Sequence, residues 1–133
     1  MRILLPTPLL LAATPLLGQD SLPPPPDLRY DILAGAGPTQ VQLRGGIYKP
    51  GEGVPLHVHP GVEMAYIVQG SIEFRIGDQV MIKHAGDSTL IPRGTPHAAR
   101  SVGPETARVV SAFVIDQGKP LRVPVGEDGK PLP

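Results

Sequence analysis

Apolar and β-branched residues occur in short runs along this chain, and in several runs they alternate with polar residues. Between residues 71 and 76, isoleucine or phenylalanine stands at every second position, with serine, glutamate and arginine between them. A period of two is typical of a strand with one buried face. No segment has a helical period of useful length. The predicted strands cover residues 41–48, 63–68, 71–76, 80–83, 88–91 and 107–115.

Glycines, two of them followed by aspartate, separate these runs. They are Gly70, Gly77-Asp78, Gly86-Asp87 and Gly94. Glycine suits tight turns because it adopts backbone conformations that other residues resist. Many short strands joined by such turns are typical of a sandwich or a barrel. The sequence therefore predicts an all-β fold.

The first eighteen residues have a different pattern. Met1 and Arg2 give a positively charged start, an apolar run fills residues 3–17, and small residues stand near its end. This order is typical of a secretory signal peptide. The run is shorter than the roughly 20 residues that a membrane-spanning helix needs. We predict a signal peptide over residues 1–18 and a periplasmic or secreted protein that leaves the membrane after cleavage. A retained membrane anchor is the alternative.

Proline and glycine mark the remaining boundaries. Residues 19–28 include the run Pro23–Pro26, which favours an extended linker, with a proline-recognition ligand as the alternative. Residues 29–123 are predicted to form the folded domain. Residues 124–133, which hold Pro124, Pro131 and Pro133, are predicted to be a flexible tail.

Length and charge are those of one small domain. The chain has 133 residues, equal numbers of acidic and basic side chains, and no block of basic residues. This balance argues against a nucleic-acid partner. Cysteine is absent, which excludes disulfides, iron–sulfur ligation and thiolate chemistry.

Three of the four histidines and one glutamate have spacings that suit a shared metal ion. His57 and His59 are two residues apart, so on a strand they point to one face with Cα atoms roughly 6.6 Å apart. Glu63 follows a Pro-Gly turn that can fold the chain back, and His97 comes from a later segment. Three imidazoles and a carboxylate form a mixed site of the kind that binds a divalent transition metal. The alternative for Glu63 is a surface carboxylate on a hairpin.

The residues around these four have the spacing of the two cupin motifs, so the sequence resembles the cupin superfamily. The resemblance covers roughly residues 29–123 and departs from the usual pattern at Ser101, where asparagine is expected. It implies a double-stranded β-helix, which is a small jelly-roll barrel. The matching residues are Gly51, His57, His59, Glu63 and Gly70 in the first motif and Gly86, Pro92, Gly94 and His97 in the second.

The resemblance also implies that Glu63 is both a metal ligand and a catalytic base. Copper, zinc, manganese, iron, cobalt and nickel all suit such a donor set. If an exported protein acquires its metal outside the cytoplasm, the Irving–Williams order favours copper or zinc. Four protein donors leave positions open on a six-coordinate ion, which is a property of reactive sites.

Three functions are compatible with this site. The first is a quercetinase-like dioxygenase acting on a small phenolic or enolisable substrate. The second is a non-oxidative isomerase, lyase or decarboxylase, and the third is a module that binds a small molecule or a metal without turnover. A homodimer that covers an exposed sheet edge is a further expectation.

The residues that recognise the substrate depend on strand register. Arg75, Arg93, Arg100 and Tyr66 would contact it only if they point into the barrel. For Met64, Tyr66, Ile67 and Phe74, core packing is favoured over a place in the pocket. His84, outside both motifs, is expected to have a structural role.

Overall fold

The structure is a computed structural model, and it describes residues 37–133. The predicted signal peptide, the proline-rich linker and the first residues of the predicted domain lie outside this range. Among the described residues, no helix is long and apolar enough to cross a membrane.

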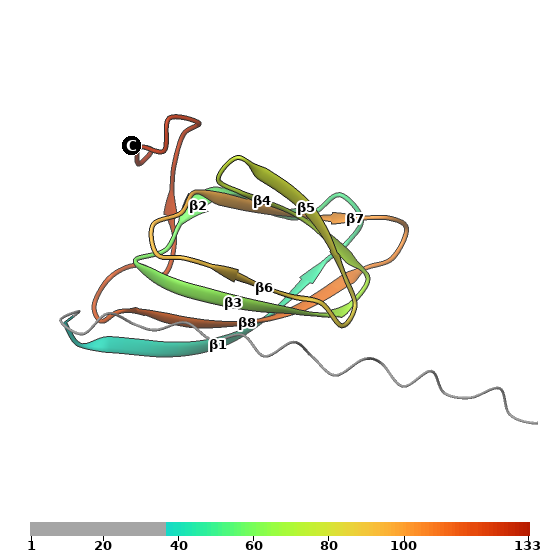
Figure 1. The fold of residues 1–133 in the computed structure, drawn as a ribbon, viewed down its shortest axis with the longest axis horizontal. Coiled ribbons are helices and arrows are strands. Elements are labelled where there is room, and N and C mark those ends of the chain that lie inside the picture. The colour runs from blue at the N-terminus through green and yellow to red at the C-terminus, as the bar shows by residue number, and fades with distance from the viewer. Residues whose placement is uncertain (1–36) are drawn as a thin grey trace, which may run out of the picture.

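The described chain forms two antiparallel sheets that face each other across the interior (Figure 1). One sheet has four strands in the order β1-β8-β3-β6, and the other has five in the order β5-β4-β7-β2-β9. The predicted all-β double-stranded β-helix is confirmed. The strands are β1 (Thr39–Tyr48), β2 (Gly53–Val58), β3 (Gly61–Gln69), β4 (Ser71–Ile76), β5 (Gln79–His84), β6 (Ser88–Ile91), β7 (His97–Val102), β8 (Ala107–Asp116) and β9 (Val123–Pro124).

Each of the six predicted strands corresponds to an observed one, and β4 and β6 have the predicted bounds. Two strands that carry site residues, β2 and β7, were not predicted. β2 contains a proline, and β7 consists mostly of small and polar residues, so neither has the composition of an independent strand. They form because they pair with each other inside the five-stranded sheet.

The core lies between the sheets and follows the period of two. On β4, Ile72 and Phe74 are buried and Arg75 is exposed, as the alternation predicts. These two side chains pack in one cluster with Ile67 of β3, Ile91 of β6 and Val109 of β8. Burial of such aliphatic side chains contributes roughly 1.5–3 kcal/mol each. The sheets are therefore held together by residues from both layers.

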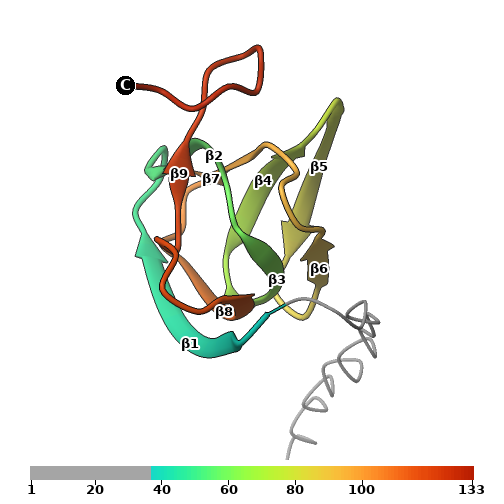
Figure 2. The same ribbon diagram turned by 90° about the vertical axis from the view of Figure 1, so that its left-hand side faces the viewer.

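The segment after β8 crosses from one sheet to the other. In Figure 2 it rises from β8 in the four-stranded sheet to β9, which pairs with β2 in the five-stranded sheet. Val125, which follows β9, is buried, and its N–H donates to the carbonyl of Leu56 at 3.2 Å. The residues predicted as a flexible tail thus have defined contacts with the barrel, including an ion pair between Glu127 and Arg75.

Gly61 offers a test of how closely β3 and β8 pack. A Cβ at this position would lie 2.0 Å from the carbonyl oxygen of Val114, which belongs to the β8 backbone. Gly61→Ala should therefore displace one strand and destabilise the fold by about 1–3 kcal/mol, the usual range for overpacking. Urea unfolding monitored by circular dichroism measures the change.

Gly45→Ala is the matched control, because a Cβ at Gly45 meets nothing within 4 Å and its backbone has no positive φ. This variant should unfold at or above the wild-type urea concentration. Equal stability of the two variants would contradict the close approach of β3 and β8.

Candidate metal centre

The four predicted ligand residues come together inside the barrel. His57 lies on β2, His59 directly after it, Glu63 on β3 and His97 at the start of β7. All four are buried, and one potential ligand atom from each lies within 4.8 Å of all the others. Residues more than thirty positions apart in the sequence thus meet at one point.

Local backbone features deliver these side chains. His57 and His97 are direct partners in the antiparallel β2–β7 pair, next to an irregularity in register after Val54. The turn before β3 brings Glu63 back toward the histidines. Gly94 (φ 68°) adopts the left-handed conformation in the loop before His97. Its N–H donates to the carbonyl of His59 at 3.1 Å, which ties the loop to the other ligands.

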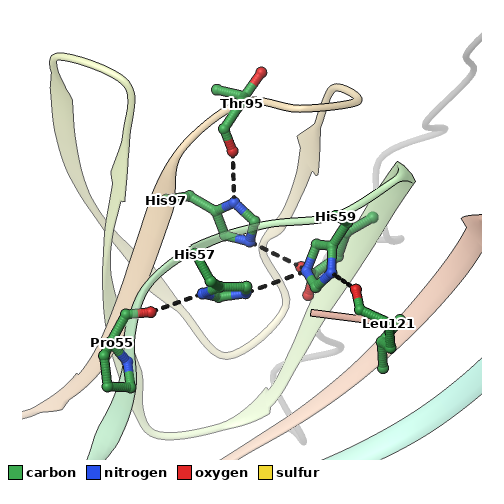
Figure 3. Close-up of polar contacts among 7 residues, drawn as sticks. Pro55, His57, His59, Thr95, His97 and Leu121 are labelled. Carbon is green, nitrogen blue, oxygen red and sulfur yellow. Dashed lines mark hydrogen bonds and ion pairs between the residues drawn. The ribbon is translucent and has the colours of Figure 1, made fainter. Parts of the chain in front are cut away.

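Each histidine is oriented by a backbone carbonyl (Figure 3). Nδ1 of His57 lies 2.7 Å from the oxygen of Pro55, and Nδ1 of His97 lies 2.8 Å from that of Thr95. Nδ1 of His59 contacts the carbonyl of Leu121 in the segment after β8. Because a carbonyl only accepts, the singly protonated form of each ring carries its proton on Nδ1 and keeps a lone pair on Nε2.

These lone pairs point at one another. Nε2 of His57 is 3.2 Å from Nε2 of His59, and Nε2 of His59 is 2.9 Å from Oε2 of Glu63. Nε2 of His97 is 3.3 Å from the same oxygen, and it is buried with no hydrogen-bond partner among the described residues. Electron-rich atoms held this close repel unless a cation lies between them. The three nitrogens and one oxygen therefore fit a divalent transition metal.

The surroundings keep two of these donors in the form that binds metal. Burial lowers the pKa of His57 to about 4, and the neighbouring His97 adds to this effect. For Glu63, burial acts to raise the pKa, but hydrogen bonds to the carboxylate from His59, His97 and Ser111 outweigh it and lower the pKa to about 2; a cation in the cluster would take the place of the two from histidine. At neutral pH the His57 imidazole is therefore uncharged and the Glu63 carboxylate is ionised.

A cavity of about 340 Å³ adjoins the ligands and includes His57, Glu63 and His97 in its wall. Apolar side chains form much of the rest of the lining: Val54, Ile72, Phe74, Ala99, Val109, Phe113 and Leu121. The core residues Ile72, Phe74 and Val109 thus also form the wall of the pocket. An ion held by the four ligands would be accessible from this cavity.

The polar side chains of the pocket differ from those considered from the sequence. Arg75, Arg93 and Arg100 do not line it, because each forms an ion pair on the outside of the barrel. Tyr66 is also absent from the lining. The lining instead includes Arg44 and Tyr48 of β1, Ser111 of β8 and Arg122 of the β8–β9 loop.

The face that β1 turns toward the interior explains why Arg44 and Tyr48 were not predicted to line the pocket. The apolar residues Val41, Leu43 and Ile47 of β1 are 63–74% exposed, so the usual assignment of the apolar face to the interior is reversed. Arg44 and Tyr48 pair with Ser111 and Ala107 of β8, which are buried. The even spacing of Arg44 and Tyr48 indicates that they share one face of the strand, but it does not indicate whether that face is inside the barrel.

Comparisons with known proteins agree with this architecture. The profile of a family described as "Cupin domain" matches residues 46–113, more than half of the chain. This chain belongs to the cupin family. No curated protein matches the cupin by sequence.

Solved structures provide more distant relatives. A Klebsiella pneumoniae subsp. pneumoniae MGH 78578 protein with a double-stranded β-helix domain is 27% identical, with a TM-score of 0.55, over 59% of this chain and 70% of that one. An oxalate oxidase in complex with the substrate analogue glycolate is 27% identical, with a TM-score of 0.57, over 70% of this chain and 52% of that one. Oxalate decarboxylase of Bacillus subtilis, which has Mn(II) centres, is 26% identical, with a TM-score of 0.55, over 59% and 22% respectively. The cupin described here thus spans about half of the oxidase and about a fifth of the decarboxylase.

With its buried His57, His59, Glu63 and His97, the protein is a metal-binding cupin. His84 lies elsewhere, on β5, where its Nδ1 is 2.9 Å from the hydroxyl of Ser71 at the surface.

His59→Ala and His97→Ala should each abolish stoichiometric metal binding. Mutation of a residue that hydrogen-bonds to a metal ligand typically lowers metal affinity by roughly 10–100-fold, and removal of the ligand itself should lower it by at least as much. Zinc titration by calorimetry, with elemental analysis of the purified protein, measures the loss. His84→Ala is the matched control and should retain one metal per chain. Wild-type affinity in His97→Ala would exclude this residue as a ligand.

The lowered pKa of His57 predicts that the metal-free protein loses stability in acid. The unfolded histidine takes a proton below about pH 6.5, whereas the folded one does so only near pH 4. Between these values the unfolded state binds more protons. The free energy of unfolding therefore decreases as the pH is lowered, by at most about 1.4 kcal/mol per pH unit from this group. Urea unfolding at several pH values in the presence of a chelator measures the slope. The slope should be smaller in His57→Gln, and parallel curves for the two proteins would refute the prediction.

Proposed function

We propose that this cupin is a metal-dependent dioxygenase that acts on a small organic substrate bound in the 340 Å³ cavity. The observation that carries the proposal is that His57, Glu63 and His97 lie in the cavity wall as well as in the ligand cluster. A structural metal site is closed by its ligands, whereas a reactive site leaves a side open to substrate. This site has such a side.

The cavity walls suit a substrate with an apolar body and an anionic oxygen. Phe74, Val109 and Phe113 supply apolar surface in the same cavity wall that holds His57, Glu63 and His97. A divalent ion held there would supply a Lewis acid for an enolate, phenolate or carboxylate oxygen. The volume lies near the lower end of the range for small-molecule sites, so a compact substrate is favoured.

Glu63 and Tyr48 are placed to handle protons. Glu63 is ionised at neutral pH and is the one carboxylate among the described residues that line the cavity, so it is the proposed proton acceptor. The pKa of Tyr48 is raised, mainly by burial, while Arg122 lowers it and Glu63 raises it. Tyr48 therefore stays protonated and can donate a hydrogen bond to bound substrate.

The likeness to oxalate oxidase supports an oxidative reaction on a small acid or a similar compound. The likeness to oxalate decarboxylase supports the second candidate, a non-oxidative reaction at the same site. Its Mn(II) centres also make manganese a candidate beside the copper or zinc expected for an exported protein. Export itself rests on the sequence of residues 1–18.

Oxygen consumption distinguishes the two candidate functions. Protein loaded separately with Mn, Fe, Cu or Zn should consume dioxygen with at least one member of a panel of flavonols, 1,3-diketones and oxalate. Glu63→Gln should lower kcat by about 10²–10⁴-fold, as expected for a lost general base, although part of the loss will reflect weaker metal binding. His84→Ala should retain full activity. Turnover that continues without oxygen would support the non-oxidative enzyme, and no turnover under any condition would contradict both candidates.

A further inference from the structure

Two arginines of the cavity wall lack the carboxylate partners that three arginines on the outside of the barrel have. Arg75, Arg93 and Arg100 pair with Glu127, Asp116 and Glu73 respectively. Arg44 instead donates from Nε to the side chain of its neighbour Gln42 at 3.0 Å. Neither Arg44 nor Arg122 forms an ion pair with another residue in the range 37–133.

Both arginines line the cavity that also holds His57, Glu63 and His97, and they come from different parts of the fold. Arg44 lies on the pocket-facing side of β1, opposite Ser111 of β8. Arg122 follows Leu121, whose carbonyl contacts His59, in the segment that Figure 2 shows crossing to the five-stranded sheet. Arg122 lines the same cavity as His57 and Tyr48.

The charge of the cavity is unbalanced. Among the described residues, Glu63 is the sole acidic side chain of the wall, against the two arginines. A divalent ion bound by Glu63 and the histidines would increase this positive excess. The ion can coordinate only substrate atoms that reach its open positions, so the arginines are available for a negative group at the far end of the substrate.

We propose that Arg44 and Arg122 form an anion subsite that binds a substrate carboxylate remote from the metal. The substrate class is then a small organic dianion, with one anionic oxygen for the metal and a carboxylate for the guanidinium groups. This inference rests on the proposed function only in assigning the first oxygen to the metal. Both arginines lie outside residues 46–113, so the subsite is a feature of this chain beyond the part that matches the family.

Guanidinium groups suit this task because their planar set of donors matches the two oxygens of a carboxylate. Both side chains line the cavity and are exposed, so their replacement should leave the core intact. Loss of one such charge-assisted contact should weaken binding by about 10–100-fold.

The experiment compares acids that differ only in the charge of their far end. Zinc-loaded protein is titrated by calorimetry with succinate against succinamate and with glutarate against glutaramate. The diacid should bind at least 10-fold more tightly than its monoamide in one pair or both. Arg44→Gln and Arg122→Gln should each remove most of this difference, while Arg122→Lys restores part of it. Arg108→Gln, which removes an exposed arginine outside the cavity, is the control for net charge and should keep the difference.

Zinc content and thermal unfolding are measured for every variant, so that lost binding cannot be attributed to an empty site or an unfolded chain. Equal affinity for diacid and monoamide, or a preference that survives both arginine substitutions, would overturn the subsite. The titrations need no turnover. Arginine-dependent diacid binding without oxygen consumption would therefore retain the subsite and reject the dioxygenase, and oxygen consumption without that binding would do the reverse.

Discussion

The site is governed by one constraint: the fold holds four electron-rich donor atoms close together although they repel one another. Three imidazole lone pairs and a carboxylate oxygen face one another because the opposite nitrogen of each ring donates to the main chain. Such an arrangement is costly in a buried position without a cation. The barrel must therefore provide enough packing energy to assemble the donors before an ion arrives. The aliphatic cluster between the two sheets is the source of that energy.

The same packing makes the site and the pocket one structural unit. Ile72 and Phe74 belong to the core and also to the cavity wall, and the ring of Phe113 on β8 packs edge-to-face with that of His59 at a centroid distance of 5.0 Å. A change in the distance between the sheets would therefore alter the ligand cluster and the space for substrate together. The segment after β8 adds a second connection, because it contacts His59 and then pairs with β2.

Much of the fold and the buried cluster of the four candidate ligands could be predicted from the sequence because they depend on side-chain type and spacing. The alternation on β4 and the His-Gly-Pro spacing around residues 51–97 are patterns of this kind. β2 and β7 escaped prediction because pairing, and not composition, makes them strands. Arg44 and Tyr48 were missed because β1 presents its apolar residues to the outside. The role of Leu121 was not predictable, since a carbonyl belongs to every residue and carries no sequence signal.

The three hydrogen-bond acceptors that orient the histidine rings are main-chain carbonyl oxygens. This affects which amino-acid changes the metal site can tolerate. Replacing the side chains of Pro55, Thr95 or Leu121 leaves their carbonyls in place as long as the path of the backbone is kept. Point substitutions at these positions should therefore leave the orientation of the histidine rings unchanged. Insertions and deletions should change it, because they move the backbone itself. A one-residue change in the length of the connection between β8 and β9 would rotate the partner of His59 away, although no ligand had been altered.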